Sequence, residues 1–329
     1  MRVRTAVLAG VVAALLFVSI AVYFAASASI LGNPDDFGVS NTSWNGLSTF
    51  VSTEHAVVLK NISSLPPDGT GYVLLEDGPS SPYSSAESAR ISSFVSTGGT
   101  LIVADGQYAI ANTLLSGMGL SSRFTGGLLT DPLFNFRNSF LVVAPTVSPS
   151  LTNVSSIAFN YATTLSVSDP GAQILAYSSD FSYLYPTQPG ASISNAPHGP
   201  FPVAALVPDG KGKVYLIADD SVFINSMITR DGNGNLLKDI SGGSMFVDTS
   251  HFVVSPATTV RNFEAAAYGV VSLWEFKYSI VIVGLAGILA YRPKPEPSAE
   301  ENELKALLGE HPEWSEERLR KLKEETDAR

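Results

Sequence analysis

The chain has 329 residues, of which 45% are hydrophobic and only 15% charged, and it contains no cysteine. The lack of cysteine excludes disulfide scaffolds, zinc–thiolate sites, iron–sulfur clusters and a cysteine nucleophile. A formal net charge of −10 argues against a nucleic-acid-binding protein. The positive mean hydropathy of +0.19 is high for a soluble protein and indicates membrane segments.

The first 30 residues predict a membrane anchor. Arg2 and Arg4 are followed by an uncharged run, residues 5–30, and about 20 apolar residues suffice to span the ~30 Å hydrocarbon core. The small residues at 26–28 also fit the cleavage pattern of a signal peptide, although the apolar run is longer than the usual ~7–15 residues. With either alternative, the segment that follows is exported.

A second span is predicted over residues 270–291. As a helix this segment would measure about 33 Å, enough to cross a bilayer, although its shorter uninterrupted part also fits a buried core helix. Basic residues beside both spans place both termini in the cytoplasm. The sequence therefore predicts a cell-membrane protein with an anchor (1–30), an extracellular domain (31–268), a transmembrane helix (270–291) and a cytoplasmic charged helical tail (292–329).

Hydrophobic patterning predicts alternating strands and helices in the outer domain. Short β-branched runs at 55–59 and 71–75 read as strands, and a capping box at 84–87 opens a helix. A strand over 100–104 and a helix near 109–115 follow. This order predicts a parallel sheet covered by helices on both faces.

The pattern over residues 121–200 is less regular and predicts either an antiparallel insertion or an excursion from the sheet. Its Phe and Tyr residues either line a groove or pack the core. The α/β pattern then resumes with strands at 203–207 and 213–218, a helix over 222–228 and a last strand at 245–248.

Three blocks carry a family resemblance. Gly212–Asn225 places Asp-Asp-Ser and Asn after an apolar strand, Phe94–Asp105 contains Gly-Gly before another strand, and Asp248–His251 pairs an acid with a histidine. They resemble blocks of an uncharacterised family of prokaryotic membrane proteins whose outer domain is similar to class I glutamine amidotransferases. The resemblance implies an α/β, flavodoxin-like or amidotransferase-like sandwich with a partly antiparallel insertion, flanked by two transmembrane helices.

The sequence departs from the amidotransferase pattern at the residues that would carry out the reaction. A class I amidotransferase needs a cysteine on a strand-to-helix turn, activated by histidine, and this chain has none. Serine could replace it, but the sequence contains no Gly-x-Ser-x-Gly. The departure implies a fold kept for binding, and no catalytic residue, cofactor or metal ion is assigned.

Polar residues at predicted strand ends and turns form the candidate binding or structural loops. Open α/β sheets bind their ligands at the carboxyl ends of strands. The alternative roles are structural: a cap at the start of a helix, a tie across a loop, or a fixed Asp–His hydrogen bond. A calcium loop over 231–242 is disfavoured, because its sixth and twelfth positions are leucine and glycine. The candidates are Asp105, Asp219, Asp220, Ser221, Asn225, Asp248 and His251.

The tail over 298–329 predicts two short helices after a proline-rich spacer. It reads either as a solvated helical hairpin or as a docking handle, and the resemblance makes an AAA-type ATPase system a candidate partner. The sequence predicts a membrane-anchored extracytoplasmic binding or adaptor protein in a membrane complex. The alternatives are a membrane-anchored hydrolase using Asp105, Asp219, Asp248 and His251, and a solute-binding component of a transporter.

Overall fold

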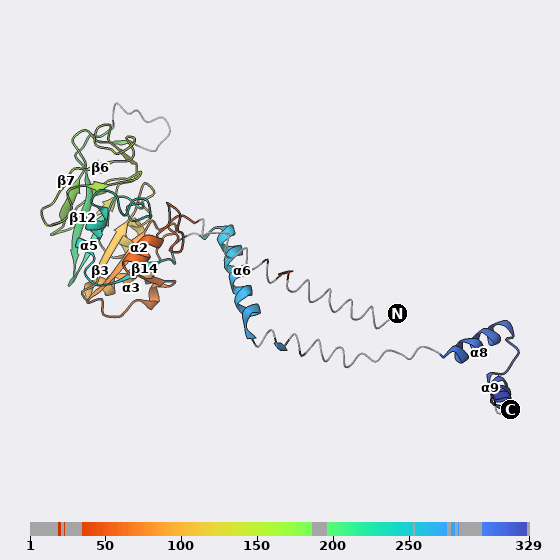
Figure 1. The fold of residues 1–329 in the computed structure, drawn as a ribbon. Coiled ribbons are helices and arrows are strands. Elements are labelled where there is room, and N and C mark those ends of the chain that lie inside the picture. Colours follow the sequence, from red (N-terminus) through yellow and green to blue (C-terminus); the bar gives the residue numbers. More distant parts are fainter. Residues whose placement is uncertain are drawn as a thin grey trace. The chain divides into compact units, whose positions relative to one another are not determined.

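The computed structural model describes residues 19–20, 23, 35–185, 196–252, 254–274, 278–279, 282 and 298–327. The chain divides into two compact units, which are described separately (Figure 1). One unit is Ser27–Glu264, and the other combines Met1–Ala26 with Ala265–Arg329.

The larger unit is a mixed α/β domain built on an eight-stranded sheet. The first five strands in spatial order are parallel, and the last three alternate in direction. In spatial order the strands are β1 (Val57–Leu59), β14 (Ser244–Asp248), β2 (Tyr72–Asp77), β3 (Thr100–Ala104), β13 (Gly212–Ile217), β12 (Pro202–Asp209), β10 (Gln173–Tyr177) and β7 (Thr146–Val147).

The central parallel strands are apolar along their length because both of their faces are covered. Every residue of β3 is buried, and β2 is buried from Val73 onward. Continuous apolar runs of this kind are typical of parallel strands with helices on both sides. The hydrophobic core therefore runs along both faces of β2, β3 and β13.

Two helices follow β2 and β3. Helix α3 (Ser85–Ser96) begins with the predicted capping box: Ser84 N–H donates to Glu87 Oε2 over 2.9 Å, and Glu87 N–H donates to Ser84 Oγ over 3.3 Å. Its buried face packs on the core, and it contacts α4 (Asn112–Gly117) and β13. These two connections advance across the sheet in one direction.

The connection from β13 to β14 returns in the opposite direction through α5 (Asn233–Ile240). Because parallel crossovers are right-handed, this reversal assigns α5 to the other face of the sheet. The short helix α2 (Ser48–Thr53) packs there through Phe50, whose ring lies 5.8 Å from that of Phe223. The predicted helix over 222–228 is wrong, since this segment forms consecutive turns.

The insertion between α4 and β12 contains three antiparallel two-stranded sheets among its described residues. The pairs are β4 (Arg123–Phe124) with β9 (Leu165–Ser166), β5 (Leu128–Thr130) with β11 (Tyr183–Tyr185), and β6 (Val143–Ala144) with β8 (Ile157–Ala158). Several of its aromatic rings lie toward the surface, whereas Phe124 and Phe159 are buried in the core. Phe134 and Phe181 stack at 6.3 Å and line a cavity of about 360 Å³.

The expectation of two flanking transmembrane helices is corrected. Among the described residues, none of the helices combines the length and the apolar character that crossing a membrane requires. Helix α6 (Pro256–Ser272) begins well before the expected second span and carries Arg261 and Glu264 within its 17 residues. The predicted localisation, a cell membrane with two spans, cytoplasmic termini and an extracellular main domain, is therefore not supported. Most of 1–30 and 275–291 lies outside the described residues.

The smaller unit ends in two helices, α8 (Ala299–Glu310) and α9 (Glu316–Asp327). Ser298 caps α8 by accepting a hydrogen bond from Glu301 N–H over 3.1 Å. The two helices contact each other, and Lys323 Nζ lies 3.6 Å from a carboxylate oxygen of Glu303.

The start of β13 depends on a residue without a side chain. A Cβ at Gly212 would lie 2.2 Å from the carbonyl oxygens of both Val95 and Gly99. We expect Gly212→Ala to lower the free energy of unfolding by about 3 kcal/mol or more, because backbone has to move. Gly242→Ala is the matched control, since nothing lies within 4 Å of its Cβ position. Urea denaturation that gives similar losses for both variants would contradict this packing.

Candidate binding site at the carboxyl edge of the sheet

Acidic side chains gather where the parallel strands end. Because these strands run in the same direction, their carboxyl ends meet at one edge of the sheet. The loops that leave β3 and β13 lead to connections running in opposite directions, and open α/β sheets bind ligands at such a reversal. The acids at this edge are Glu76, Asp77, Asp105, Asp219, Asp220 and Asp248; all are buried except Asp220, which is half-buried.

These acids form two clusters because successive residues of a strand point to opposite faces. Glu76 lies with Asp248 and His251, whereas the charges that act on Asp77 are those of Asp105, Asp219 and Asp220. We call the second group, Asp77, Asp105, Asp219 and Asp220, the aspartate cluster.

Backbone N–H groups hold two members of the aspartate cluster. Asp105 accepts from Gly106 N–H and Ala111 N–H, over 2.8 and 2.7 Å. Asp219 accepts from Ser221 N–H and Asn160 N–H, over 2.7 and 2.6 Å. Each of these two carboxylates therefore has a donor on both of its oxygens, which fixes its orientation.

Asp220 lies between the ends of β2 and β3. Its Oδ1 accepts a hydrogen bond from Ser221 Oγ over 3.0 Å. A Cβ at Gly106 would lie 2.8 Å from Asp220 Oδ2, and one at Gly78 would lie 3.2 Å from Asp220 Cβ. Glycine at these two positions lets the Asp220 side chain approach the edge of the sheet.

Among the described residues, the carboxyl group of Asp77 has no hydrogen-bond partner. Both of its carboxylate oxygens are buried without a donor or an acceptor, and the residue is 2% exposed. Burial raises the pKa of Asp77 well above its usual range, and the charges of Asp220, Asp219 and Asp105 raise it further. Among the described residues, no ion pair joins the aspartate cluster to a basic side chain.

The pKa values of the other members of the aspartate cluster are also raised. Burial raises the pKa of Asp105 to about 7, although the N–H groups of Ala111 and Gly106 oppose the shift. Burial also raises the pKa of Asp219, with the charge of Asp220 adding to it, and burial raises the pKa of Asp220. The cluster therefore holds more negative charge than this environment favours at neutral pH.

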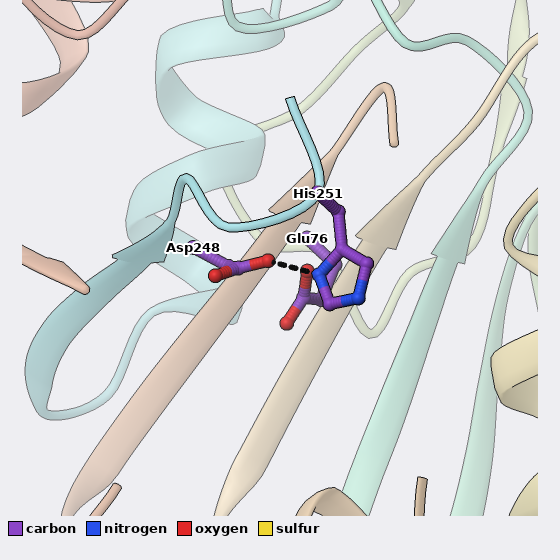
Figure 2. A group of neighbouring side chains, drawn as sticks. All are labelled: Glu76, Asp248 and His251. Atoms are coloured by element: carbon purple, nitrogen blue, oxygen red, sulfur yellow. Dashed lines mark hydrogen bonds and ion pairs between the residues drawn. The ribbon is translucent and has the colours of Figure 1, made fainter. Parts of the chain in front are cut away.

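Figure 2 shows the second cluster, in which the carboxylates of Glu76 and Asp248 approach the ring of His251. His251 Nδ1 lies 2.6 Å from Asp248 Oδ2, and Tyr83 stacks on the imidazole with ring centroids 3.8 Å apart. Tyr83 also donates its hydroxyl hydrogen to Glu76 Oε2 over 2.6 Å. The contact recorded for His251 Nε2 is Glu87 Oε2, at 3.7 Å.

Electrostatics separate the two carboxyl groups of this cluster. Burial raises the pKa of Glu76 well above its usual range, and the charge of Asp248 adds to that effect. Burial also acts to raise the pKa of Asp248, but hydrogen bonds from His251 and Ser250 outweigh it and lower the value. One ligand atom from each of Glu76, Asp248 and His251 falls within 4.8 Å of the others, so the group could hold a metal ion.

The sequence candidates fall into three places. Asp105, Asp219 and Asp220 meet in the aspartate cluster, Ser221 contacts two of them, and Asp248 contacts His251. No helix begins after Asp220 for these residues to cap, because the segment forms turns.

Asn225 lies apart from both clusters. It accepts from Thr49 N–H over 2.8 Å and donates to the carbonyl oxygens of Asn41 and Ser43 over 2.9 and 2.6 Å. Asn225 thus ties the segment before α2 to the turns after β13. In the disfavoured calcium loop, Asn233 is instead buried, where its amide contacts Ala158 N–H and C=O.

Sequence reasoning missed Glu76, Asp77 and Tyr83. A signal for two of them was present, since Glu76 and Asp77 directly follow the apolar run Val73–Leu75. Two adjacent acids at the end of a strand that is buried on both faces must both point into covered space. Tyr83 carries no comparable signal, because its contacts with Glu76 and His251 depend on how the loop before α3 folds back over the sheet edge.

The family described as Domain of unknown function (DUF4350) matches residues 39–240, more than half of the chain, so the chain belongs to this family. That match agrees with the expected family of unknown function and does not bear on the amidotransferase resemblance. No curated protein matches the chain.

Solved structures show weak likenesses. The mmIFT52 N-terminal domain is 14% identical, with 50% of this chain and 73% of that chain covered and a TM-score of 0.40. A β-galactosidase from Bacillus circulans sp. alkalophilus is 12% identical (52% and 23% covered, TM-score 0.30). The exo-β-1,4-mannosidase Op5Man5 from Opitutaceae bacterium strain TAV5 is 13% identical (62% and 26% covered, TM-score 0.29). The chain thus spans about a quarter of these glycosidases, and similarities at this level assign it no activity.

The aspartate cluster predicts a stability that falls as pH rises. The pKa of Asp105 is about 7 in the folded chain, against about 3.9 when unfolded, so the folded state binds more protons between these values. The resulting contribution of Asp105 to the free energy of unfolding is fully present below about pH 4 and is lost as pH rises through 7. It amounts to at most about 4 kcal/mol.

We expect the free energy of unfolding, measured in urea, to decrease from pH 5 to pH 8. Asp77→Asn should flatten that decrease, because it removes a carboxyl group whose own pKa is raised by burial, without removing a hydrogen bond. Asp68→Asn is the control, since Asp68 is exposed and distant from the cluster in the fold. A pH-independent stability, or an unchanged slope in Asp77→Asn, would contradict the interpretation.

Proposed function

We propose that this member of the DUF4350 family is a binding protein whose aspartate cluster receives the positively charged group of a ligand, an ammonium or a guanidinium. The ligand can be a free amine or a basic side chain of a partner protein, because both present the same group. In this proposal the domain recognises its ligand and performs no chemistry on it.

The observation that carries the proposal is the state of Asp77. Burying a carboxyl group without a hydrogen bond costs several kcal/mol, and burying it in the ionised form costs more. Protonation alone does not resolve this, because neither oxygen of Asp77 has a partner that could accept the proton. A cation that carries N–H donors supplies both the missing charge and the missing hydrogen bonds.

The separation between the carboxylates of the aspartate cluster favours a cation that is larger than a bare metal ion. Among the described residues, the group whose ligand atoms converge within 4.8 Å is Glu76, Asp248 and His251, not the aspartate cluster. An ammonium offers three donors and a guanidinium offers five in a planar fork, so either can contact carboxylates that are further apart.

The position of the cluster also supports a binding role. It follows β3 and β13, whose connections run in opposite directions, which is where open α/β sheets place their ligands. Asp220 is half-buried and Asp36, whose charge acts on it, is exposed. Negative charge therefore extends from the surface to the buried Asp77, which would attract a cation.

The surroundings of His251 favour binding over the alternative of a hydrolase. A general base needs a nucleophile or water within hydrogen-bond reach of its free nitrogen. The neighbour of Nε2 is the carboxylate of Glu87, the His251 side chain is 5% exposed, and Tyr83 covers one face of the imidazole. The carboxylate of Glu87 is not the kind of nucleophile that an Asp–His pair activates, which is a hydroxyl or a thiol.

Thermal unfolding of the full chain with added cations tests the proposal. We expect spermidine or agmatine to raise the melting temperature of the wild type, at constant ionic strength. Asp77→Asn should abolish the rise, because the neutral amide of similar shape removes the charge. Asp68→Asn should respond like the wild type, since it changes net charge equally at an exposed site.

Two results would overturn the proposal. The first is the absence of a shift with either amine, or an equal shift in Asp77→Asn. The second is a shift that appears with Mg²⁺ or Ca²⁺ and not with the amines, which would assign a metal ion to the cluster in place of an organic cation.

A further inference from the structure

The cluster of Glu76, Asp248 and His251 has one oxygen of each carboxylate held by a neighbour. Tyr83 donates to Glu76 Oε2, while Ser250 N–H and Oγ–H donate to Asp248 Oδ1 over 2.9 and 2.7 Å. The remaining two oxygens differ: Asp248 Oδ2 contacts His251 Nδ1, and Glu76 Oε1 is buried without any partner. One ligand atom from each of the three residues lies within 4.8 Å of the others, and Figure 2 shows the three side chains facing one another.

We propose that Glu76, Asp248 and His251 bind one divalent transition-metal ion, of the class of Zn²⁺, through Glu76 Oε1, Asp248 Oδ2 and His251 Nδ1. Imidazole nitrogen favours Zn²⁺ and its neighbours in the first transition row over Mg²⁺ or Ca²⁺, and carboxylates complete mixed N/O sites for these ions. Hydrogen bonds that orient the ligands from outside are a regular property of such sites.

Charge balance agrees with a divalent ion. Two carboxylates and a neutral imidazole carry a net charge of −2, which a single M²⁺ cancels. All three residues are at most 4% exposed, so an uncompensated charge would be costly here. The ion also gives Glu76 Oε1 the partner that it lacks.

The distance between Asp248 and His251 requires only a small adjustment. His251 Nδ1 and Asp248 Oδ2 are 2.6 Å apart and share a proton in the metal-free arrangement. Ligand bonds of about 2.0–2.2 Å in tetrahedral geometry separate two ligand atoms by roughly 3.4 Å, so this pair has to open by somewhat less than 1 Å. Rotation of the Asp248 and His251 side chains can provide that change.

The contacts around the site show which segments an ion would hold together. Tyr83 stacks on His251, and the backbone carbonyl of His251 accepts a hydrogen bond from Ser80 N–H over 2.9 Å. An ion at this position would connect the turn after β14 to the end of β2, and the Ser80 hydrogen bond joins the same turn to the loop before α3. The site and the aspartate cluster use opposite faces of β2, so this inference does not rest on the proposed function.

Metal analysis of the full chain tests the inference. We expect the protein, stripped with a chelator and then incubated with Zn²⁺, to retain one ion per chain in competition with a chromophoric chelator. Glu76→Gln should weaken Zn²⁺ binding at least 100-fold, because it removes a charged ligand yet preserves the volume and the acceptor for Tyr83. Ser250→Ala should weaken it about 10- to 100-fold through loss of orientation.

His198→Gln is the matched control, because it removes a histidine that is distant from the site in the fold. It should bind Zn²⁺ like the wild type. Visible absorption of Co²⁺ added to the wild type gives a readout that does not depend on how a variant folds, and it should show a low-symmetry site with nitrogen and oxygen ligands. Failure of the wild type to retain Zn²⁺, a spectrum of hydrated Co²⁺, or unchanged binding in Glu76→Gln would overturn the inference.

Discussion

The burial of acidic side chains at the carboxyl edge of the parallel sheet is the constraint on which the rest of this domain depends. Removing a carboxylate from water is unfavourable unless donors, protons or cations compensate for it. Four neighbouring strand ends, those of β14, β2, β3 and β13, bring such groups together, because parallel strands all deliver their last residues to the same edge. Much of the local structure at this edge serves to accommodate negative charge.

The negative charges of the acidic side chains at this edge are compensated in different ways. Asp105 and Asp219 use backbone N–H groups of the loops that follow them, Asp248 uses His251, and one oxygen of Glu76 uses Tyr83. These contacts also fix the loops, since each donor belongs to a segment that would otherwise be free to adopt other turns. Asp77 is the exception, and the proposed cation site follows from that exception.

Glu87 links this edge to the helices. It forms the capping box at the start of α3 and lies 3.7 Å from His251, so one side chain contacts both the α3 terminus and the turn after β14. The Ser84 side chain and backbone hold the pKa of Glu87 below its usual range, and the charge of His251 acts in the same direction. The position of α3 and the geometry of the Glu76, Asp248 and His251 cluster are therefore coupled through the carboxylate of Glu87.

Local patterns determined a large part of the fold. Apolar runs located β2, β3, β13 and β14, and the capping box at Ser84 located α3, because these signals depend on residues that are near in sequence. The same reasoning gave a wrong helix over 222–228, where Asp219 and Ser221 form a turn instead. Hydropathy alone predicted membrane spans, but α6 begins elsewhere and includes charged residues.

The sequence by itself determined the alternation of strands and helices, the acidic residues at strand ends and the lack of a cysteine nucleophile. The tertiary structure decided which of those acids share a site. It joined Asp77 to residues more than 140 positions away and separated Asn225 from them, and it set Glu76 beside Asp248 and His251 on the other face of β2. The physical reason is that strand order and facing direction are set by long-range packing across the sheet, which no local pattern in the chain encodes.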